Sequence, residues 1–437
     1  MKNRICFSFF VALCASMSAQ AIPLFARKTG MACTACHESW PRLTDFGQLY
    51  RDRGFRLARG RDAPVEQDPA YWPLSFRTAA GYQFLRQALQ NTDAGPKDVQ
   101  TGSFGFTGLD VLTAGTLGDK LGFLVVYTPG LGSAGFGLAP SGGDLESAWV
   151  TVAEPFGTGW VNLRVGKHAL DQPIDEHRTL TLTQGYGAYH FHPQGSASAF
   201  EVGRNQTGLE VWGHSEVGRL RYSVSFFNEN STPYSGHLFS SPTVWGHVQG
   251  LQHLDNGVLV AVKAGLFGAI GFHPVVQDVV TPQGGTPTPV LGTGRDLRAF
   301  NRVGGELHLR FFSNTTPLTL SGVVFTAKED AGLSQAPAGT PQDATWLGGF
   351  GEVTWTPALF LTALVRVERN RTLNPGDSAA LAELGDQTIV TAVLRSTLDI
   401  SNRNGFAVQL EASRSTIRAL GASPPMTTVL AAVDFAY

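Results

Sequence analysis

Short and long connections alternate along most of this chain of 437 residues, and this alternation constrains the fold more than any other feature. From residue 74 onward, apolar and polar residues alternate with a period of two, which predicts strands with one apolar face. Short turns are expected at 117–119, 155–159, 215–218, 254–257, 313–317, around 357 and at 401–405. Longer polar loops rich in glycine and proline lie near 88–100, 130–143, 169–206, 229–243, 271–297, 328–343, 371–385 and 417–424.

Seven short turns and eight long loops join sixteen strands, although the pattern also fits fourteen or eighteen. A soluble sandwich would show the same alternation within each strand. An unbroken alternation of short turns and long loops is instead typical of outer-membrane β-barrels. We therefore predict an antiparallel barrel of about 16 strands over residues 74–437, with both the N- and the C-terminus periplasmic. Trp160, Trp355 and the alternating segment 429–437 with its terminal aromatic residue agree with this prediction.

The longest connection, 169–206, follows the fifth predicted strand. A barrel with this many strands has an open lumen. The barrel half resembles general porins, in which the third extracellular loop follows the fifth strand and folds into the lumen. The resemblance implies that this loop does the same.

The N-terminus has the features of a secretory signal peptide. Lys2 and Arg4 precede an apolar run at 7–14 and a small-residue cleavage site at 19–21, which predicts removal of residues 1–21. A lipoprotein signal at Cys14 is the weaker alternative. Without the signal, 31 basic residues face 35 acidic residues, for a formal charge of −4. This charge does not suit a nucleic-acid-binding protein.

Cys33 and Cys36 are the only cysteines outside this signal, and His37 follows them directly. Two thiols on one helical turn can form thioethers to one haem, with the next histidine as the proximal iron ligand. A structural zinc site would need about four ligands. We therefore predict one covalent haem c on a helical segment, residues 22–73. This segment is too small to bury a haem alone, so we expect it to dock in or against the periplasmic mouth of the barrel.

The stretch FARKTGMACTACHESWPRLTDFGQLYRDRGF, residues 25–55, resembles the head of the fused cytochrome–porin family, which includes bacterial outer-membrane iron oxidases. The matching residues are Phe25, Ala26, Arg27, Thr29, Gly30, Met31, Cys33, Cys36, His37, Pro41, Leu43, Phe46 and Gly47. Trp40 and Phe55 depart mildly from the family pattern, which would have phenylalanine and tyrosine there.

The resemblance implies a monohaem cytochrome–porin that transfers electrons across the outer membrane. The implied donor is extracellular Fe(II), and the implied acceptor is a periplasmic electron-carrier cytochrome or another soluble redox protein. Two alternatives stay open at this point. One is electron export to an external acceptor, and the other is a porin or channel with a cytochrome plug.

The distal iron ligand is not evident in the sequence. Met31 lies too close to Cys33 to reach the distal face, and Met426 begins the last strand. The candidates are His190 and His192, in the loop expected to fold inward, together with His214 and His308, which face the lumen by alternation; water or an open position is equally compatible. Carboxylates that could attract iron are Asp93, Asp98, Asp171, Asp175, Glu176, Glu329 and Asp330, although ordinary solvated loop charge explains each of them as well.

Overall fold

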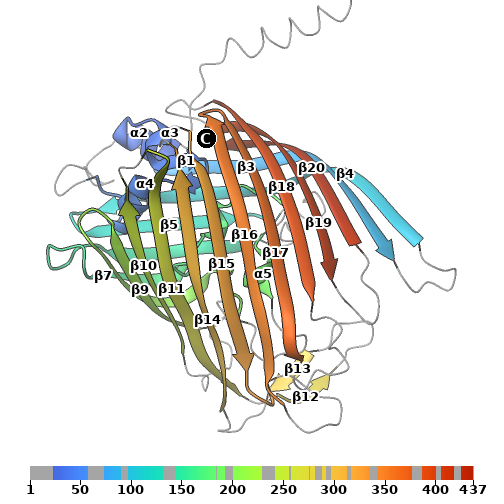
Figure 1. Ribbon diagram of the computed structural model, residues 1–437. Helices are drawn as coiled ribbons and strands as arrows, with labels where there is room; N and C mark the ends of the chain where they lie inside the picture. The colour runs from blue at the N-terminus through green and yellow to red at the C-terminus, as the bar shows by residue number, and fades with distance from the viewer. Residues whose placement is uncertain are drawn as a thin grey trace, which may run out of the picture.

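The computed structural model of this chain is a closed β-barrel (Figure 1). It describes residues 23–57, 73–89, 97–130, 143–183, 185–191, 200–228, 242–254, 257–274, 276–280, 288–291, 297–312, 316–333, 342–375, 386–399, 405–417 and 425–436. The predicted signal peptide and most of the predicted linker, 58–72, lie outside these residues.

The barrel contains sixteen strands, and each pairs antiparallel with its neighbours. They are β3 (Leu74–Leu89), β4 (Lys97–Leu117), β5 (Leu121–Thr128), β6 (Asp144–Val152), β7 (Asn162–His168), β8 (Gln206–His214), β9 (Leu220–Asn228), β10 (Thr243–His253), β11 (Leu259–Pro274), β14 (Leu297–Phe311), β15 (Leu318–Glu329), β16 (Ala344–Ala358), β17 (Leu361–Pro375), β18 (Gln387–Asp399), β19 (Gly405–Ile417) and β20 (Pro425–Ala436). The ring closes where β20 pairs with β3, from Met426 opposite Gln87 to Ala436 opposite Arg77. The predicted antiparallel barrel and its strand number are confirmed.

The connections follow the predicted alternation, with shifts at their edges. The turn expected around 357 falls after Ala358, because β16 continues through Pro357. The connection expected at 271–297 is more structured than predicted. There β11 runs to Pro274, and β12 (Val276–Val280) pairs with β13 (Thr288–Leu291) in a separate two-stranded sheet.

Charged side chains of the wall face the interior of the barrel, where apolar side chains also pack against the inward segment, whereas large apolar side chains cover the outer face. On β9, Arg221 is 9% exposed, whereas Phe226, on the other face of the same strand, is 43% exposed. The buried charged residues of the wall include Arg164, Glu210, Arg302, Glu306, Glu352, Arg366, Glu368, Arg395, Glu411 and Asp434. Trp160 and Trp355 are exposed beside short turns. This apolar-out, polar-in arrangement is that of a membrane barrel.

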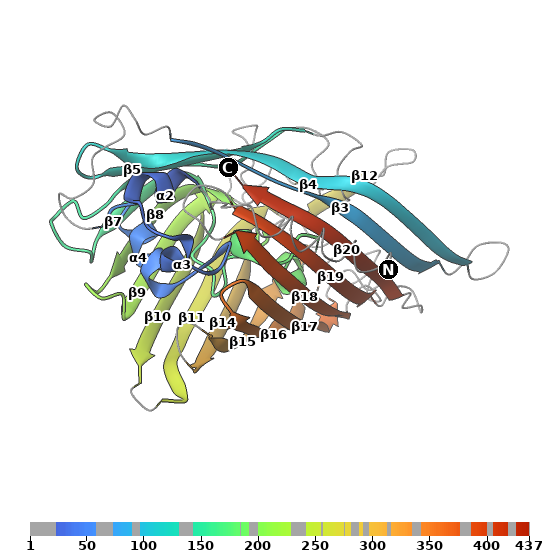
Figure 2. The same ribbon diagram turned by 90° about the horizontal axis from the view of Figure 1, so that it is seen from above.

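The N-terminal segment, residues 23–57, lies within the outline of the strands (Figure 2). It consists of α2 (Pro23–Thr29), α3 (Cys33–Cys36), the short paired strands β1 (His37–Ser39) and β2 (Arg42–Leu43), and α4 (Asp45–Asp52). No helix in the part of the chain that the structure describes is long and apolar enough to cross a membrane. Thr44 caps α4, since its hydroxyl accepts a hydrogen bond from the Gly47 N–H at 3.0 Å.

The connection between β7 and β8 also folds into the barrel over its described residues, 169–183, 185–191 and 200–205, which are called the inward segment here. Its residues Leu170, Ile174, Tyr186, Ala188, Tyr189, Phe200 and Val202 join a buried apolar cluster with the inner wall. It also reaches the other side of the ring, where the backbone N–H groups of Leu182 and Thr183 donate to Glu411 in β19. The predicted inward fold of this loop is confirmed.

Candidate functional site

Ion pairs hold the N-terminal segment against the inner wall. Arg42 lies 2.9 Å from Glu352 of β16, and Arg310 of β14 contacts Asp45 at 3.1 Å as well as Glu38. Glu352 is fully buried, so the Arg42 guanidinium neutralises a charge that water does not reach. The segment therefore supplies charges that complement those of the lumen.

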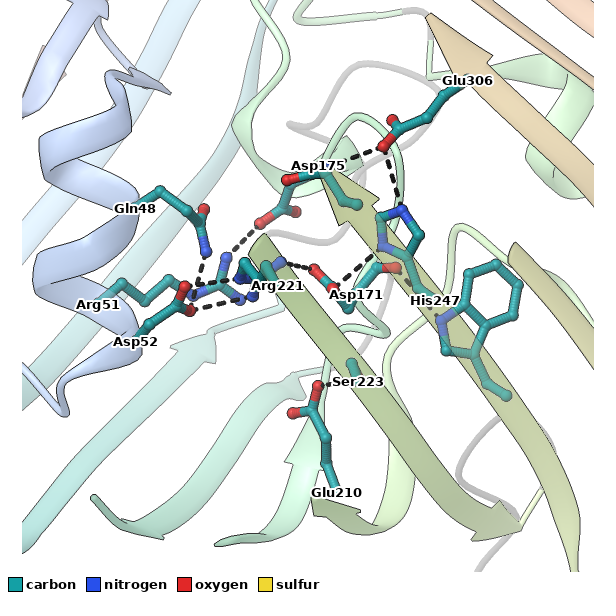
Figure 3. A network of polar contacts seen from close by, with 12 residues as sticks. Gln48, Arg51, Asp52, Asp171, Asp175, Glu210, Arg221, Ser223, His247 and Glu306 are labelled. Carbon is teal, nitrogen blue, oxygen red and sulfur yellow. Dashed lines mark hydrogen bonds and ion pairs between the residues drawn. The ribbon is translucent and has the colours of Figure 1, made fainter. Parts of the chain in front are cut away.

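A chain of charged groups joins the N-terminal segment to the inward segment and the wall (Figure 3). Arg221 of β9 donates to Asp52 of α4 at 2.6 and 3.0 Å and also contacts Asp171 of the inward segment. Asp171 lies 3.0 Å from one ring nitrogen of His247, whose other ring nitrogen lies 3.1 Å from Glu306. Each buried charged side chain in this network has a partner of opposite sign. Without such a partner, its burial would cost free energy.

Aromatic packing fixes the other side of the N-terminal segment. Phe25 stacks on Phe55 with ring centroids 4.5 Å apart, and Phe55 stacks on Trp149 of β6 at 5.6 Å. Gly122 of β5 allows the close approach, because a Cβ there would lie 2.7 Å from the carbonyl oxygen of Gly54. The apolar part of the segment therefore packs on β5 and β6, opposite its ion pairs.

The two cysteines lie on one helical turn, as the sequence predicts. Thr44 fixes this turn to the start of α4, because its N–H donates to the carbonyl of Cys36 and its hydroxyl donates to that of Ala35. A Cβ at Gly47 would overlap the Cys36 carbonyl oxygen, so α4 can approach the turn only with glycine there. The two cysteines do not form a disulfide bond with each other, and burial raises the pKa of the Cys36 thiol.

Cys33, Cys36 and His37 line a cavity of about 380 Å³ between the N-terminal segment, the wall and the inward segment. This volume falls in the range of ~300–1,000 Å³ that is usual for cofactor sites. The apolar lining includes Leu24, Phe25, Tyr50, Phe55, Leu124, Val126 and Trp149, and the polar lining includes Arg51, Arg77, Glu146, His177 and Arg178. An apolar cavity with two thiols at its edge fits a covalently attached haem.

His37 is oriented as an iron ligand would be. Its Nδ1 donates to the carbonyl oxygen of Pro41 at 3.1 Å, so Nε2 is the ring nitrogen that could bind a metal. Burial, with the positive charge of Arg178 as a second cause, lowers the pKa of His37 to about 4. The ring is therefore neutral at physiological pH, which is the form that binds a metal.

His177 lines the same cavity and was not among the candidates from the sequence. Its Nδ1 lies 3.1 Å from a carboxylate oxygen of Glu146, and its Nε2 is buried without a hydrogen-bond partner among the described residues. Burial opposes protonation of this ring, but the hydrogen bond to Glu146 outweighs it and raises the pKa of His177 to about 9. The only feature of the sequence that could have pointed to His177 is its position in the loop expected to fold inward.

His190 does not line this cavity, although it lies in the inward segment as predicted. Its two ring nitrogens contact Glu176 at 2.7 Å and Glu201 at 2.6 Å. Burial disfavours the charged ring, but these two carboxylates outweigh it and raise the pKa of His190 to about 10. His192 lies outside the described residues.

His308 and His214 are buried on the inner face of the wall, as alternation predicts, but neither lines the cavity beside the cysteines. The ring nitrogens of His308 contact Ser321 at 2.9 Å and Glu306 at 2.7 Å. His214 uses Nδ1 for a contact of 3.0 Å with the Ser215 carbonyl. The cavity brings together Cys33, Cys36 and His37, but none of the described distal candidates.

The six described carboxylates considered for iron capture are all engaged in ion pairs, and Asp93 lies outside the described residues. Asp171 contacts Arg221, and Asp175 lies 2.8 Å from Arg51. Within the described ranges, no group of three or more histidine, cysteine, aspartate or glutamate side chains has the geometry to hold a metal ion.

Comparison with known proteins shows that the fold of this chain is similar to that of solved structures. No known family model matches the chain, and no curated protein matches its sequence. Among solved structures, it is similar to an anion-selective porin from Comamonas acidovorans, with a TM-score of 0.51, 13% identity and coverage of 83% of this chain and 98% of that chain. OprB of Pseudomonas putida (TM-score 0.49, 10% identity, 84% and 94% coverage) and DcaP of Acinetobacter baumannii (0.49, 12%, 83% and 96%) are also similar. The chain has the fold of a porin-like β-barrel.

Proposed function

We propose that this protein is an outer-membrane monohaem cytochrome–porin that transfers electrons across the membrane in which it is embedded. The proposed donor is extracellular Fe(II), and the proposed acceptor is a periplasmic electron-carrier cytochrome. One observation carries the proposal: Cys33, Cys36 and His37 line a cavity inside the barrel, shared with the wall and the inward segment. A haem-bearing segment that hung free beside an open channel would not have this environment.

The residues that would hold the haem are Cys33 and Cys36, through thioethers, and His37, through Nε2. When bound, the haem supplies a reversible one-electron couple. The chain supplies apolar surface in the lining of the cavity through Phe55 and Trp149. The Pro41 carbonyl orients the ring of His37, and Thr44 holds the cysteine turn.

The outward face of the strands supports an outer-membrane location. Val165, Leu266 and Val303 are among many large apolar side chains that face away from the barrel and are more than half exposed. Exposed apolar surface of this kind is stable against the hydrocarbon of a membrane, whereas its contact with water costs free energy. The short turns lie at the end of the barrel that holds the N-terminal segment and Ala436, which supports periplasmic termini and a cytochrome partner on that side.

Iron as the donor rests on the resemblance of residues 25–55 to cytochrome–porins. The carboxylates that the structure describes support a transient contact rather than a dedicated iron site, because Asp171 and Asp175 already form ion pairs. An outer-sphere contact is sufficient for electron transfer and requires no tight site. Electron export to an external acceptor would use the same residues in the opposite direction.

A porin with a cytochrome plug is the second candidate, and the likeness to an anion-selective porin favours it. The N-terminal segment and the inward segment occupy the interior of the barrel, which argues against this second candidate. The N-terminal segment pairs with β9, β14 and β16, while the inward segment packs on β9, β10 and β16 and binds β19. A solute channel would have to pass between these contacts.

Stopped-flow mixing of purified holoprotein with Fe(II) tests the proposal. We expect the absorption band of the reduced haem to appear within the mixing experiment, and a soluble cytochrome added afterwards to reoxidise it. The matched control is the double variant Cys33→Ser with Cys36→Ser, which should carry no covalent haem. A holoprotein that neither Fe(II) nor another one-electron donor reduces would contradict the proposal.

A further inference from the structure

His177 lines the cavity that Cys33, Cys36 and His37 also line, and its Nε2 is buried without a hydrogen-bond partner among the described residues. It lies in the short helical turn η3 (Glu176–Arg178) of the inward segment. Its backbone N–H donates to the side chain of Asp175 at 3.1 Å, which fixes the turn that carries the ring. A buried polar atom without a partner is costly, so a site that retains one needs an explanation.

Glu146 of β6 fixes the ring orientation and its tautomer. The Glu146 carboxylate lies 3.1 Å from Nδ1 of His177 and can only accept, so the proton resides on Nδ1. Nε2 is then the atom that can give up its proton and offer a lone pair. Histidines bound to metals in proteins usually have such a contact at the other ring nitrogen. His37 has the equivalent contact with the Pro41 carbonyl.

We infer that Nε2 of His177 would bind the haem iron together with His37, with Glu146 as the positioning residue of the His177 ring. The inference rests on the proposed function, because it requires a haem at Cys33 and Cys36. It deepens that function, since one iron ligand would come from the N-terminal segment and the other from the inward segment. His37 and His177, which are 140 residues apart in sequence, would then hold the same group.

Other side chains fit this role less well. His168 and His214 also have a buried Nε2 without a hydrogen-bond partner among the described residues, but neither lines the cavity. Met31 lines the cavity, but it lies two residues before Cys33 on the same backbone. A thioether ligand would give a higher reduction potential than a second imidazole, so the two ligands can be told apart.

The test uses full-length holoprotein, matured with covalent haem and purified in detergent. Electron paramagnetic resonance and absorption spectra of the oxidised protein should show a low-spin, six-coordinate iron with two imidazole ligands. In His177→Ala we expect a change to a high-spin or water-bound iron, and added imidazole should restore the low-spin spectrum. The matched control is His214→Ala, which removes another buried ring with an unpartnered Nε2 and should leave the spectrum unchanged.

Two further variants keep the test informative if His177→Ala is misfolded. His177→Met should stay low-spin, gain a sulfur-to-iron charge-transfer band and show a higher midpoint potential. Glu146→Gln should stay low-spin, and its midpoint potential should rise because the anionic contact that strengthens the imidazole ligand is lost. Neither shift is expected if His177 only packs against the cavity.

The outcomes separate this inference from the proposed function. Covalent haem whose spectrum is unchanged in His177→Ala, or whose low-spin form is lost in Met31→Leu, overturns the inference and leaves the proposed function standing. Protein that acquires no covalent haem overturns both.

Discussion

Arg221 of β9 donates two hydrogen bonds to the carboxylate of Asp52 in α4, at 2.6 and 3.0 Å. The barrel wall therefore binds the last turn of α4, the helix that follows the cysteines. The Asp52 side chain is 2% exposed and that of Arg221 is 10% exposed. Removing one partner of such a pair leaves an uncompensated buried charge, which costs roughly 3–5 kcal/mol. This contact therefore contributes to keeping the N-terminal segment inside the barrel.

Asp52→Asn should loosen the N-terminal segment. We expect faster cleavage of the segment by added protease and a lower midpoint of thermal unfolding, while the barrel still assembles. The control is Asp98→Asn, which removes an exposed ion pair with Arg86 and should change neither. Equal protease resistance of Asp52→Asn and the wild type would show that the pair does not hold the segment.

Gly47→Ala should impair haem attachment. A methyl group at this position overlaps the Cys36 carbonyl oxygen, so α4 must move away from the cysteine turn. We expect several-fold less haem per polypeptide on haem-stained gels. Gly351→Ala is the matched control, because nothing lies within 4 Å of a Cβ there. Full haem content in Gly47→Ala would contradict the tight packing of α4 on this turn.

Because of His190, the inward segment should become less stable as the pH rises into the alkaline range. Its pKa is raised from 6.5 to about 10 by Glu176 and Glu201, which outweigh the effect of burial. The folded state therefore binds the proton more tightly than the unfolded state does. The stabilisation is complete below pH 6.5 and is lost as the pH rises through 10. Unfolding temperatures between pH 6 and 11 should fall more steeply in the wild type than in His190→Gln, and parallel curves would exclude this role.

The N-terminal segment should block the lumen. Because the segment pairs with β9, β14 and β16, we expect low single-channel conductance for the full chain in planar bilayers. Deletion of residues 22–73 should raise it. Equal conductance with and without these residues would favour a solute channel that bypasses the plug.

The barrel could be predicted from the sequence because its two signals are local. Strand period and connection length are both visible along the chain, and together they give the strand number and the inward course of the loop after the fifth strand. Strand ends were less predictable. Polar residues such as those near Lys97 and Pro375 continue the ladder beyond the apolar stretch, because the partner strand still offers hydrogen bonds.

The cysteine turn and His37 could also be predicted, since the short motif Cys-x-x-Cys-His, residues 33–37, defines them. The distal side of the cavity could not. His190 and His177 lie in the same loop, and only packing decides that His190 meets Glu176 and Glu201 while His177 lines the cavity. Partners of that kind are brought together by the closed barrel, and no spacing in the sequence reveals them.

Electron transfer through the membrane-embedded protein is the central claim, and proteoliposomes test it most directly. Holoprotein is reconstituted into vesicles that contain an oxidised soluble cytochrome, Fe(II) is added outside, and the absorbance of the enclosed cytochrome is followed. The account predicts reduction of the enclosed cytochrome with the wild type and only slow leakage with Cys33→Ser/Cys36→Ser. Equal rates for the two proteins, or no reduction with fully haem-loaded wild type, would contradict it.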